Sequence, residues 1–210
     1  MAGNNSEVFS VLALVISALA LATSAVTAWL TLLRRGTVKM TQPTVIFFGP
    51  DGPREARGNT SPKVFLRTLL FSTSKRGRII ENMYVTLSCE DISQDFNVWA
   101  YGERNELVRG SGLFVGETGV EANHHFLIAR DSERFGFIPG TYSLNVYAHL
   151  LGEKERRILF SQILTVSPEE AESIGEQNAG LYFDWAPDRM RYVTHIDEEP
   201  RSFWESAKRR

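Results

Sequence analysis

The sequence predicts an all-β protein, an antiparallel β-sandwich carried on a single N-terminal transmembrane helix and followed by a short C-terminal helix and extension. Two observations lead to this fold class. Residues 8–33 contain no charged residue, histidine, proline or glycine. After Pro43, runs rich in β-branched and aromatic residues alternate with turns that contain glycine and proline, a pattern typical of a sandwich. Most of the 210 residues lie outside the helix, which is enough chain for one domain with its own core.

Residues 8–33 are predicted to form the transmembrane helix. A helix rises about 1.5 Å per residue, so roughly 20 apolar residues cross the hydrocarbon core, and this segment is longer. A cleaved signal peptide is one alternative, but such peptides have a cationic start and a shorter apolar run. Residues 1–7, expected as a polar lead outside the membrane, contain Glu7 and no cation. A buried core helix is a second alternative, although few run so long without a charge.

Cations that follow the helix predict its orientation. Arg34, Arg35 and Lys39 lie in a basic connector, residues 34–42, whereas no lysine or arginine precedes the helix. Because cationic flanks stay in the cytoplasm, we expect a single-pass protein of the cell membrane with its C-terminal domain on the cytoplasmic side. The same three side chains are candidates for contact with anionic lipid headgroups.

Small residues recur along the helix at alternating steps of three and four. This spacing matches the period of about 3.5 residues in a packed helical seam, and small or hydroxyl side chains let helices approach closely in lipid. We expect this stripe to contact a second copy of the helix or another membrane protein. The alternative is chance, because alanine, serine and threonine are common throughout the segment. The stripe consists of Ser10, Ala13, Ser17, Ala20, Ser24, Thr27 and Thr31.

The sandwich domain is expected over residues 43–167. Residues 49–62 are dense in glycine, proline, aspartate and asparagine and are predicted to form a loop. Further turns are expected at glycine-containing segments between the apolar runs. The runs themselves are predicted to be strands because β-branched and aromatic residues dominate them. The expected strands are residues 45–48, 63–74, 82–89, 96–101, 113–115, 123–129, 141–150 and 157–166.

Tyr142 indicates which type of β-sandwich the sequence predicts. It follows the Pro139–Gly140 pair and opens an alternating strand. This arrangement resembles the tyrosine corner of immunoglobulin-like sandwiches, in which the phenol bonds to the backbone across a turn. The resemblance implies an immunoglobulin-like sandwich, but it concerns the fold alone and supplies no function. The cysteine pair of antibody domains is absent, since Cys89 is the only cysteine, and we expect it to be a small buried side chain.

Residues 168–210 are predicted to form a short helix and an aromatic-rich extension. Ser167 is a suitable N-cap, and the proline and two glutamates after it suit a first helical turn. Residues 181–185 are expected to pack back on the sandwich, with an added strand as one arrangement. Tryptophan and arginine are enriched in protein-binding surfaces, whereas Trp185 as plain core is the alternative. The candidate partner surface consists of Asp184, Trp185, Arg189, Arg191, Phe203 and Trp204.

No residue pattern predicts an enzyme. Glu121, His124 and His125 resemble a metal-ligand cluster, but adjacent histidines on a strand point to opposite faces and do not readily bind one ion. We expect one of these histidines inside and one at the surface. Residues 110–119 are rich in glycine but lack the Lys-Ser/Thr that follows a phosphate-binding loop, so a glycine-bent hairpin is expected. We therefore predict no catalytic residue, no metal and no cofactor.

The charge balance limits the partners. The chain has a net charge of −2, which does not suit a general nucleic-acid binder. One compact basic turn, with Lys75, Arg76 and Arg78, is a candidate for contact with phosphate or headgroups, and a solvated turn is the alternative. The single cysteine agrees with a reducing compartment because it allows no intramolecular disulfide.

These features predict a membrane-anchored binding or scaffolding protein. Its cytoplasmic sandwich would recruit a protein partner at the lipid bilayer, and its helix would allow it to form oligomers. One alternative is a sensor or effector whose sandwich binds a ligand and whose helix oligomerises to perturb the membrane. Another is an envelope protein with the sandwich outside the cytoplasm. The sequence does not name the partner or the ligand.

Overall fold

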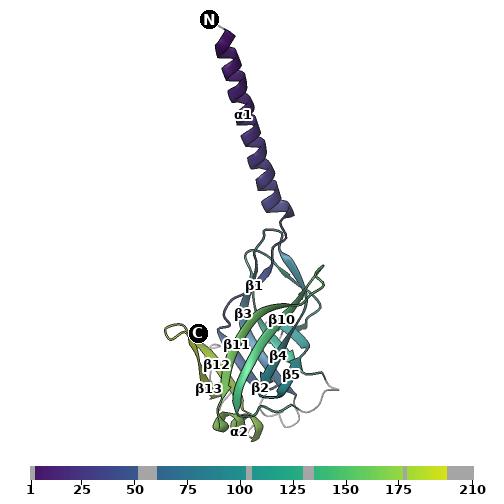
Figure 1. The fold of residues 1–210 in the computed structure, drawn as a ribbon. Helices are drawn as coiled ribbons and strands as arrows, with labels where there is room; N and C mark the ends of the chain where they lie inside the picture. Colours follow the sequence, from purple (N-terminus) through teal and green to yellow (C-terminus); the bar gives the residue numbers. More distant parts are fainter. Residues whose placement is uncertain (1–2, 52–60, 103–105, 130–134, 177–178, 198–210) are drawn as a thin grey trace, which may run out of the picture.

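The computed structural model describes residues 3–51, 61–102, 106–129, 135–176 and 179–197. An N-terminal helix, α1 (Gly3–Ala28), continues into a π-helical turn, η1 (Trp29–Leu33), and is followed by a body of two antiparallel sheets. The helix stands away from this body (Figure 1). The prediction of a mostly β protein with one N-terminal apolar helix is therefore confirmed.

From Val8 onward, helix α1 carries large apolar side chains on all sides. Its large side chains are exposed, with Leu21 73% and Phe9 69% accessible. The stretch Glu7–Thr31 is long and apolar enough to cross a membrane, a test that a signal sequence also passes. In η1, the Arg34 N–H donates to the Trp29 carbonyl oxygen at 2.8 Å, and the chain then becomes extended.

The first sheet has the strand order β13-β12-β2-β3-β9-β6-β7, with β1 beside the far end of β3. Its neighbouring strands are antiparallel throughout. Strand β3 carries the alternation of buried and half-buried residues expected when one face of a sheet is covered. The bounds are β1 Val38–Met40, β2 Val45–Pro50, β3 Pro62–Ser72, β6 Val98–Gly102, β7 Val108–Arg109, β9 Val120–Leu127, β12 Gly180–Ala186 and β13 Arg191–Asp197.

The second sheet has the order β11-β10-β4-β5, with β8 beside the start of β4. Strands β4 and β10 form its centre and pair along most of their length. Every second residue of β10 from Tyr142 to Leu150 is buried, so this face packs against the first sheet. The bounds are β4 Arg78–Cys89, β5 Ile92–Phe96, β8 Leu113–Val115, β10 Gly140–Leu150 and β11 Arg157–Val166.

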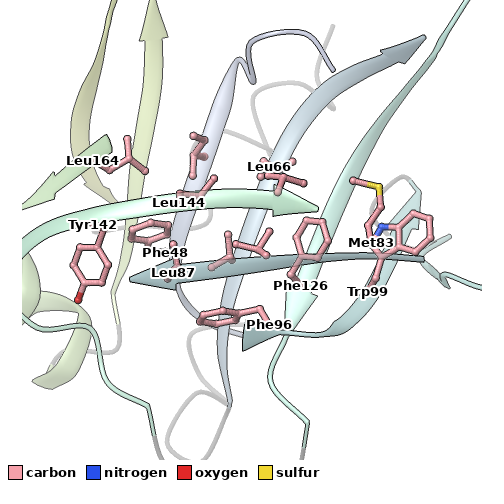
Figure 2. Packing of buried hydrophobic residues seen from close by; sticks show 14 of the residues in the cluster. Phe48, Leu66, Met83, Leu87, Phe96, Trp99, Phe126, Tyr142, Leu144 and Leu164 are labelled. Carbon is pink, nitrogen blue, oxygen red and sulfur yellow. The ribbon is translucent and has the colours of Figure 1, made fainter. Parts of the chain in front are cut away.

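One hydrophobic core lies between the sheets. Figure 2 shows Leu66 and Phe126 of the first sheet in the same cluster as Leu87 and Leu144 of the second. All four side chains are at most 1% exposed. Burial of each such side chain is worth roughly 1.5–3 kcal/mol, so this shared core is the main stabilising feature of the body.

Two local features differ from the sequence-based expectation. Strand β1 lies inside the predicted connector and pairs with β3 from Val38 opposite Ser72. A strand of three residues is too short for its alternation to be recognised in the sequence. The expected strand at residues 96–101 is divided, since Phe96 ends β5 in the second sheet and Trp99 lies in β6 of the first. Both side chains are buried, and their spacing of three does not fit a single strand with alternating faces.

The C-terminal segment completes the first sheet. Helix α2 (Pro168–Glu176) begins with a capping box, in which Ser167 Oγ accepts from the Glu170 N–H at 3.2 Å and the Glu170 carboxylate accepts from the Ser167 N–H at 2.8 Å. Strand β12 pairs with β2, with Leu181 opposite Phe48. The expected packing of residues 181–185 is thus confirmed as an added strand, and β13 extends the sheet further.

Tyr142 bonds to the backbone as expected. Its hydroxyl donates to the Ile138 carbonyl oxygen and accepts from the Ile138 N–H, both at 2.8 Å. The side chain is 1% exposed, and this burial raises its pKa to about 12. The phenol therefore fixes the turn that leads into β10.

Candidate functional site

The predicted partner surface falls on the hairpin formed by β12 and β13, at one side of the body (Figure 1). The register places Trp185 opposite Tyr192 and brings Arg191 opposite the end of β12. Asp184 lies on β12, and Arg189 lies in the turn. We name these four predicted residues, Asp184, Trp185, Arg189 and Arg191, together with Met190, the hairpin surface. The predicted residues Phe203 and Trp204 lie outside the described residues.

Trp185 contributes to packing in this hairpin. Its ring meets the Tyr192 ring edge-on, with centroids 5.2 Å apart. The Tyr192 hydroxyl donates to the Pro43 carbonyl oxygen at 2.8 Å and accepts from Gln42 Nε2 at 3.0 Å, and burial raises the Tyr192 pKa. The two aromatic rings thus attach the hairpin to the segment before β2, which leaves Trp185 half-buried.

The turn of the hairpin is exposed. Met190 is 74% accessible and has a positive φ of 51°. Arg189 lies beside Asp188 at 3.5 Å, and the Asp184 carboxylate lies 3.0 Å from His195 Nδ1. Among the described strands, β13 is one edge of its sheet and β7 the other, and an edge strand presents backbone groups that can pair with another chain.

A second candidate lies on the outer face of the second sheet, and sequence reasoning missed it. Tyr84 and Tyr147 are register partners on β4 and β10, and their rings stack with centroids 4.9 Å apart. The Arg156 guanidinium covers both rings at 5.8 and 5.2 Å. Burial raises the pKa of Tyr84, and the nearby Arg156 opposes this rise. A shallow open depression adjoins the stack, lined by Asn82, Tyr84, His149, Lys154, Glu155 and Arg156.

The histidine pair on β9 points to opposite faces, as expected. His124 is fully buried, and its Nδ1 accepts from Trp99 Nε1 at 3.2 Å, while its Nε2 has no hydrogen-bond partner among the described residues. His125 lies on the outer face against the Phe65 ring, with centroids 4.9 Å apart. Burial lowers the pKa of His124 to about 4, with His125 adding to the effect, and burial also lowers the pKa of His125 to about 4.

Glu121 does not join these histidines. Its carboxylate accepts from Arg67 at 2.8 Å on the outer face. Within the described parts of the chain, no group of three histidine, cysteine, aspartate or glutamate side chains has the arrangement of a metal site. The β9 residues therefore act in packing and surface pairing.

The predicted lipid-contacting residues occupy two regions. Arg34 and Arg35 follow η1 and are exposed, whereas Lys39 lies in β1 on the outer face of the first sheet. In the small-residue stripe, the Thr27 hydroxyl donates to the Thr23 carbonyl oxygen and the Thr31 hydroxyl to that of Thr27, each at 2.8 Å. Both hydroxyls donate within their own helix. They therefore allow a second helix to approach closely, but they do not donate hydrogen bonds to it.

Comparison of the chain with protein-family models, with curated proteins and with solved structures found no match.

Proposed function

We propose that this chain is a single-pass membrane protein whose β body is a protein-binding module held at the cytoplasmic face of a membrane. The observation that carries the proposal is the exposure of α1. Within the described parts of the chain, none of the candidate span is buried against the body. Exposed apolar surface costs roughly 25 cal/mol per Å² in water, and a bilayer removes that cost. Arg34 and Arg35 support the cytoplasmic orientation of the body.

We infer that the body is an immunoglobulin-like sandwich. The order β2-β3-β9-β6 in one sheet and β11-β10-β4-β5 in the other matches the ABED and GFC sheets of that architecture, with β5 in the place of an added C′ strand. Tyr142 lies at the start of β10, the strand that corresponds to F, where the tyrosine corner is found. Strands β12 and β13 would then be additions beside strand A.

The hairpin surface is the proposed protein-binding region. Met190 and the flanking arginines project from the turn, and β13 offers an edge for an added strand from a partner. An extended segment with acidic side chains fits such a region because backbone pairing would supply affinity and the arginines would supply selectivity. The membrane anchor would raise the effective concentration of partners on the same surface.

Self-association through the small-residue stripe of α1 is part of the proposal. Ala13, Ser17 and Ala20 leave room for a second helix to approach closely. Replacement of Ser17 and Ser24 by leucine should abolish dimers of the full chain in a membrane crosslinking assay. A chain that remains equally dimeric, or is monomeric before substitution, would contradict a role of the stripe.

Site-specific photo-crosslinking tests the protein-binding region. A photoreactive amino acid at Met190 should give a discrete adduct in native membranes, and one at the exposed Ile92, the first residue of β5, serves as the matched control. The double substitution Arg189→Glu and Arg191→Glu should remove the adduct, whereas Lys75→Glu and Lys154→Glu should leave it. Equal adducts at both positions, none at Met190, or an adduct indifferent to the arginines would contradict the proposal.

A further inference from the structure

At the junction of helix and body, hydrogen bonds join the body to the residues that directly follow the helix. The Thr37 N–H donates to Thr73 Oγ1, and the Thr73 N–H donates to the Thr37 carbonyl oxygen, both at 2.9 Å. Arg78 Nη1 donates to the Gly36 carbonyl oxygen at 3.3 Å. The turn between β3 and β4 is therefore held against residues 36–37.

Two further turns lie at the same end of the body. Arg78 Nη2 forms an ion pair of 2.8 Å with Glu153, which also binds Arg157, so the β10–β11 turn is joined to β4. The interactions with arginine lower the pKa of Glu153 and keep it charged. The Ser72 N–H donates to the Gly116 carbonyl oxygen at 2.9 Å, which brings the β8–β9 turn alongside. We name this end the junction rim (Figure 1). It consists of the three turns, residues 34–37 and the adjoining strand residues Arg78, Ile79, Glu81, Phe114 and Arg157.

The junction rim is cationic although the chain as a whole has a net charge of −2. Its carboxylates belong to Glu81, Glu117, Glu153 and Glu155, of which Glu153 is bound by two arginines and Glu81 by His149. Cations outnumber these carboxylates two to one. They are Arg34, Arg35, Lys75, Arg76, Arg78, Lys154, Arg156 and Arg157.

Exposed apolar side chains lie among these cations. Phe114 is 60% exposed and faces its register partner Ile79, itself 39% exposed. Leu151 is 52% exposed, and its N–H donates to the Ile79 carbonyl oxygen at 2.9 Å. Large apolar side chains surrounded by lysine and arginine are typical of surfaces that enter the headgroup layer of a membrane.

The chain between helix and body is too short to hold this end away from the lipid. Residues 36 and 37 already bond to the body, and Arg34 caps the end of the helix through Trp29, so the link consists of Arg34 and Arg35 alone. At about 3.5 Å per extended residue, the link keeps Gly36, where the chain joins the rim, within about 10 Å of the end of the helix. The potential of an anionic surface reaches about 8–10 Å at physiological salt.

We infer that the junction rim docks on an anionic bilayer surface, with Leu151 and Phe114 in the headgroup layer and Lys75 and Lys154 against lipid phosphates. This inference rests on the proposed membrane anchoring and extends it, because it fixes the body against the membrane rather than leaving it on a loose tether. Docking would also hold the hairpin surface at a constant orientation relative to the membrane.

Depth-dependent fluorescence quenching tests this docking on the full chain in nanodiscs. A fluorophore is attached at Leu151→Cys or, at the opposite end of the body, at Ile92→Cys, since the native Cys89 is buried. Quenching by headgroup-spin-labelled lipid is compared between phosphatidylcholine discs and discs with about a third phosphatidylglycerol. The label at 151 should be quenched strongly in anionic discs and weakly in neutral ones, and the label at 92 in neither.

Charge variants separate specific docking from mere proximity. Each cation at an anionic surface shifts docking about fivefold, so Lys75→Gln with Lys154→Gln should lower the ratio of docked to undocked chain about 25-fold. The matched pair Arg189→Gln and Arg191→Gln should leave the ratio unchanged. Equal quenching at positions 151 and 92, quenching indifferent to lipid charge, or equal effects of the two variant pairs would overturn the inference. A chain that fails to enter the discs would instead contradict the anchoring.

Discussion

Acid should destabilise the β body through the histidine pair of β9. Burial holds the pKa of His124 at about 4 and that of His125 at about 4 in the folded protein, whereas an unfolded histidine has a pKa near 6.5. The unfolded chain thus takes up protons first as the pH falls. The stabilisation is complete above about pH 6.5 and is lost as the pH falls toward 4.

The size of this effect follows from the difference in pKa. Lowering the pH from about 7 to about 5 should reduce the free energy of unfolding by about 2 kcal/mol for one such histidine. His125 is less deeply buried than His124, so its effect should be smaller. The same change in pH should therefore lower the free energy of unfolding by about 3 kcal/mol for the two histidines together. Since a domain of this kind is stable by about 5–15 kcal/mol, the loss should be readily measurable.

Urea unfolding of the full chain in mild detergent, followed by tryptophan fluorescence, measures the effect. His124→Gln keeps an acceptor for Trp99 Nε1 but does not titrate, so it should remove about half or more of the pH dependence. His125→Gln should remove the smaller remainder. The reasoning would be refuted if His124→Gln unfolded with the same dependence on pH as the unsubstituted chain.

Three further substitutions test the packing. Tyr142→Phe leaves both Ile138 backbone groups without their partner and should cost about 1–3 kcal/mol of unfolding free energy, whereas the control Tyr147→Phe on the outer face should cost less than about 0.5 kcal/mol. Gly110→Ala would place a Cβ 2.0 Å from the Trp99 ring and should cost about 1–3 kcal/mol by overpacking, seen as a lower urea midpoint. Ser167→Ala removes the cap of α2 and should lower stability in the same assay by about 1 kcal/mol.

Most of the fold was accessible from the sequence because one face of each long strand is buried. The alternation is strict in β3 and β10, and in β4 from Met83 onward, so their runs of β-branched and aromatic residues gave reliable strand positions. The capping pattern at Ser167 likewise predicted the start of α2, because a cap is local. Strand β1 was missed since its three residues gain stability only from pairing with β3, and β13 was missed because its residues are mostly exposed.

The candidate sites depend on features that a sequence does not show. Tyr84 and Tyr147 are far apart in the chain, and only the register of β4 with β10 brings their rings together. The junction rim gathers three turns, two of which connect strands of different sheets, and the sequence predicts only the basic turn at Lys75 as a candidate for headgroup contact. The hairpin surface was predicted by composition, but the packing of Trp185 on Tyr192 became clear only in the structure.

Protease treatment of sealed membrane vesicles tests the central claim most directly. The full chain is expressed in cells, and right-side-out and inverted vesicles are washed with alkaline carbonate and then digested. We expect the chain to stay with the membranes and the β body to be degraded only in inverted vesicles, where the cytoplasmic face is exposed. Release of the chain by carbonate, or removal of the body from right-side-out vesicles, would contradict a β body anchored at the cytoplasmic face.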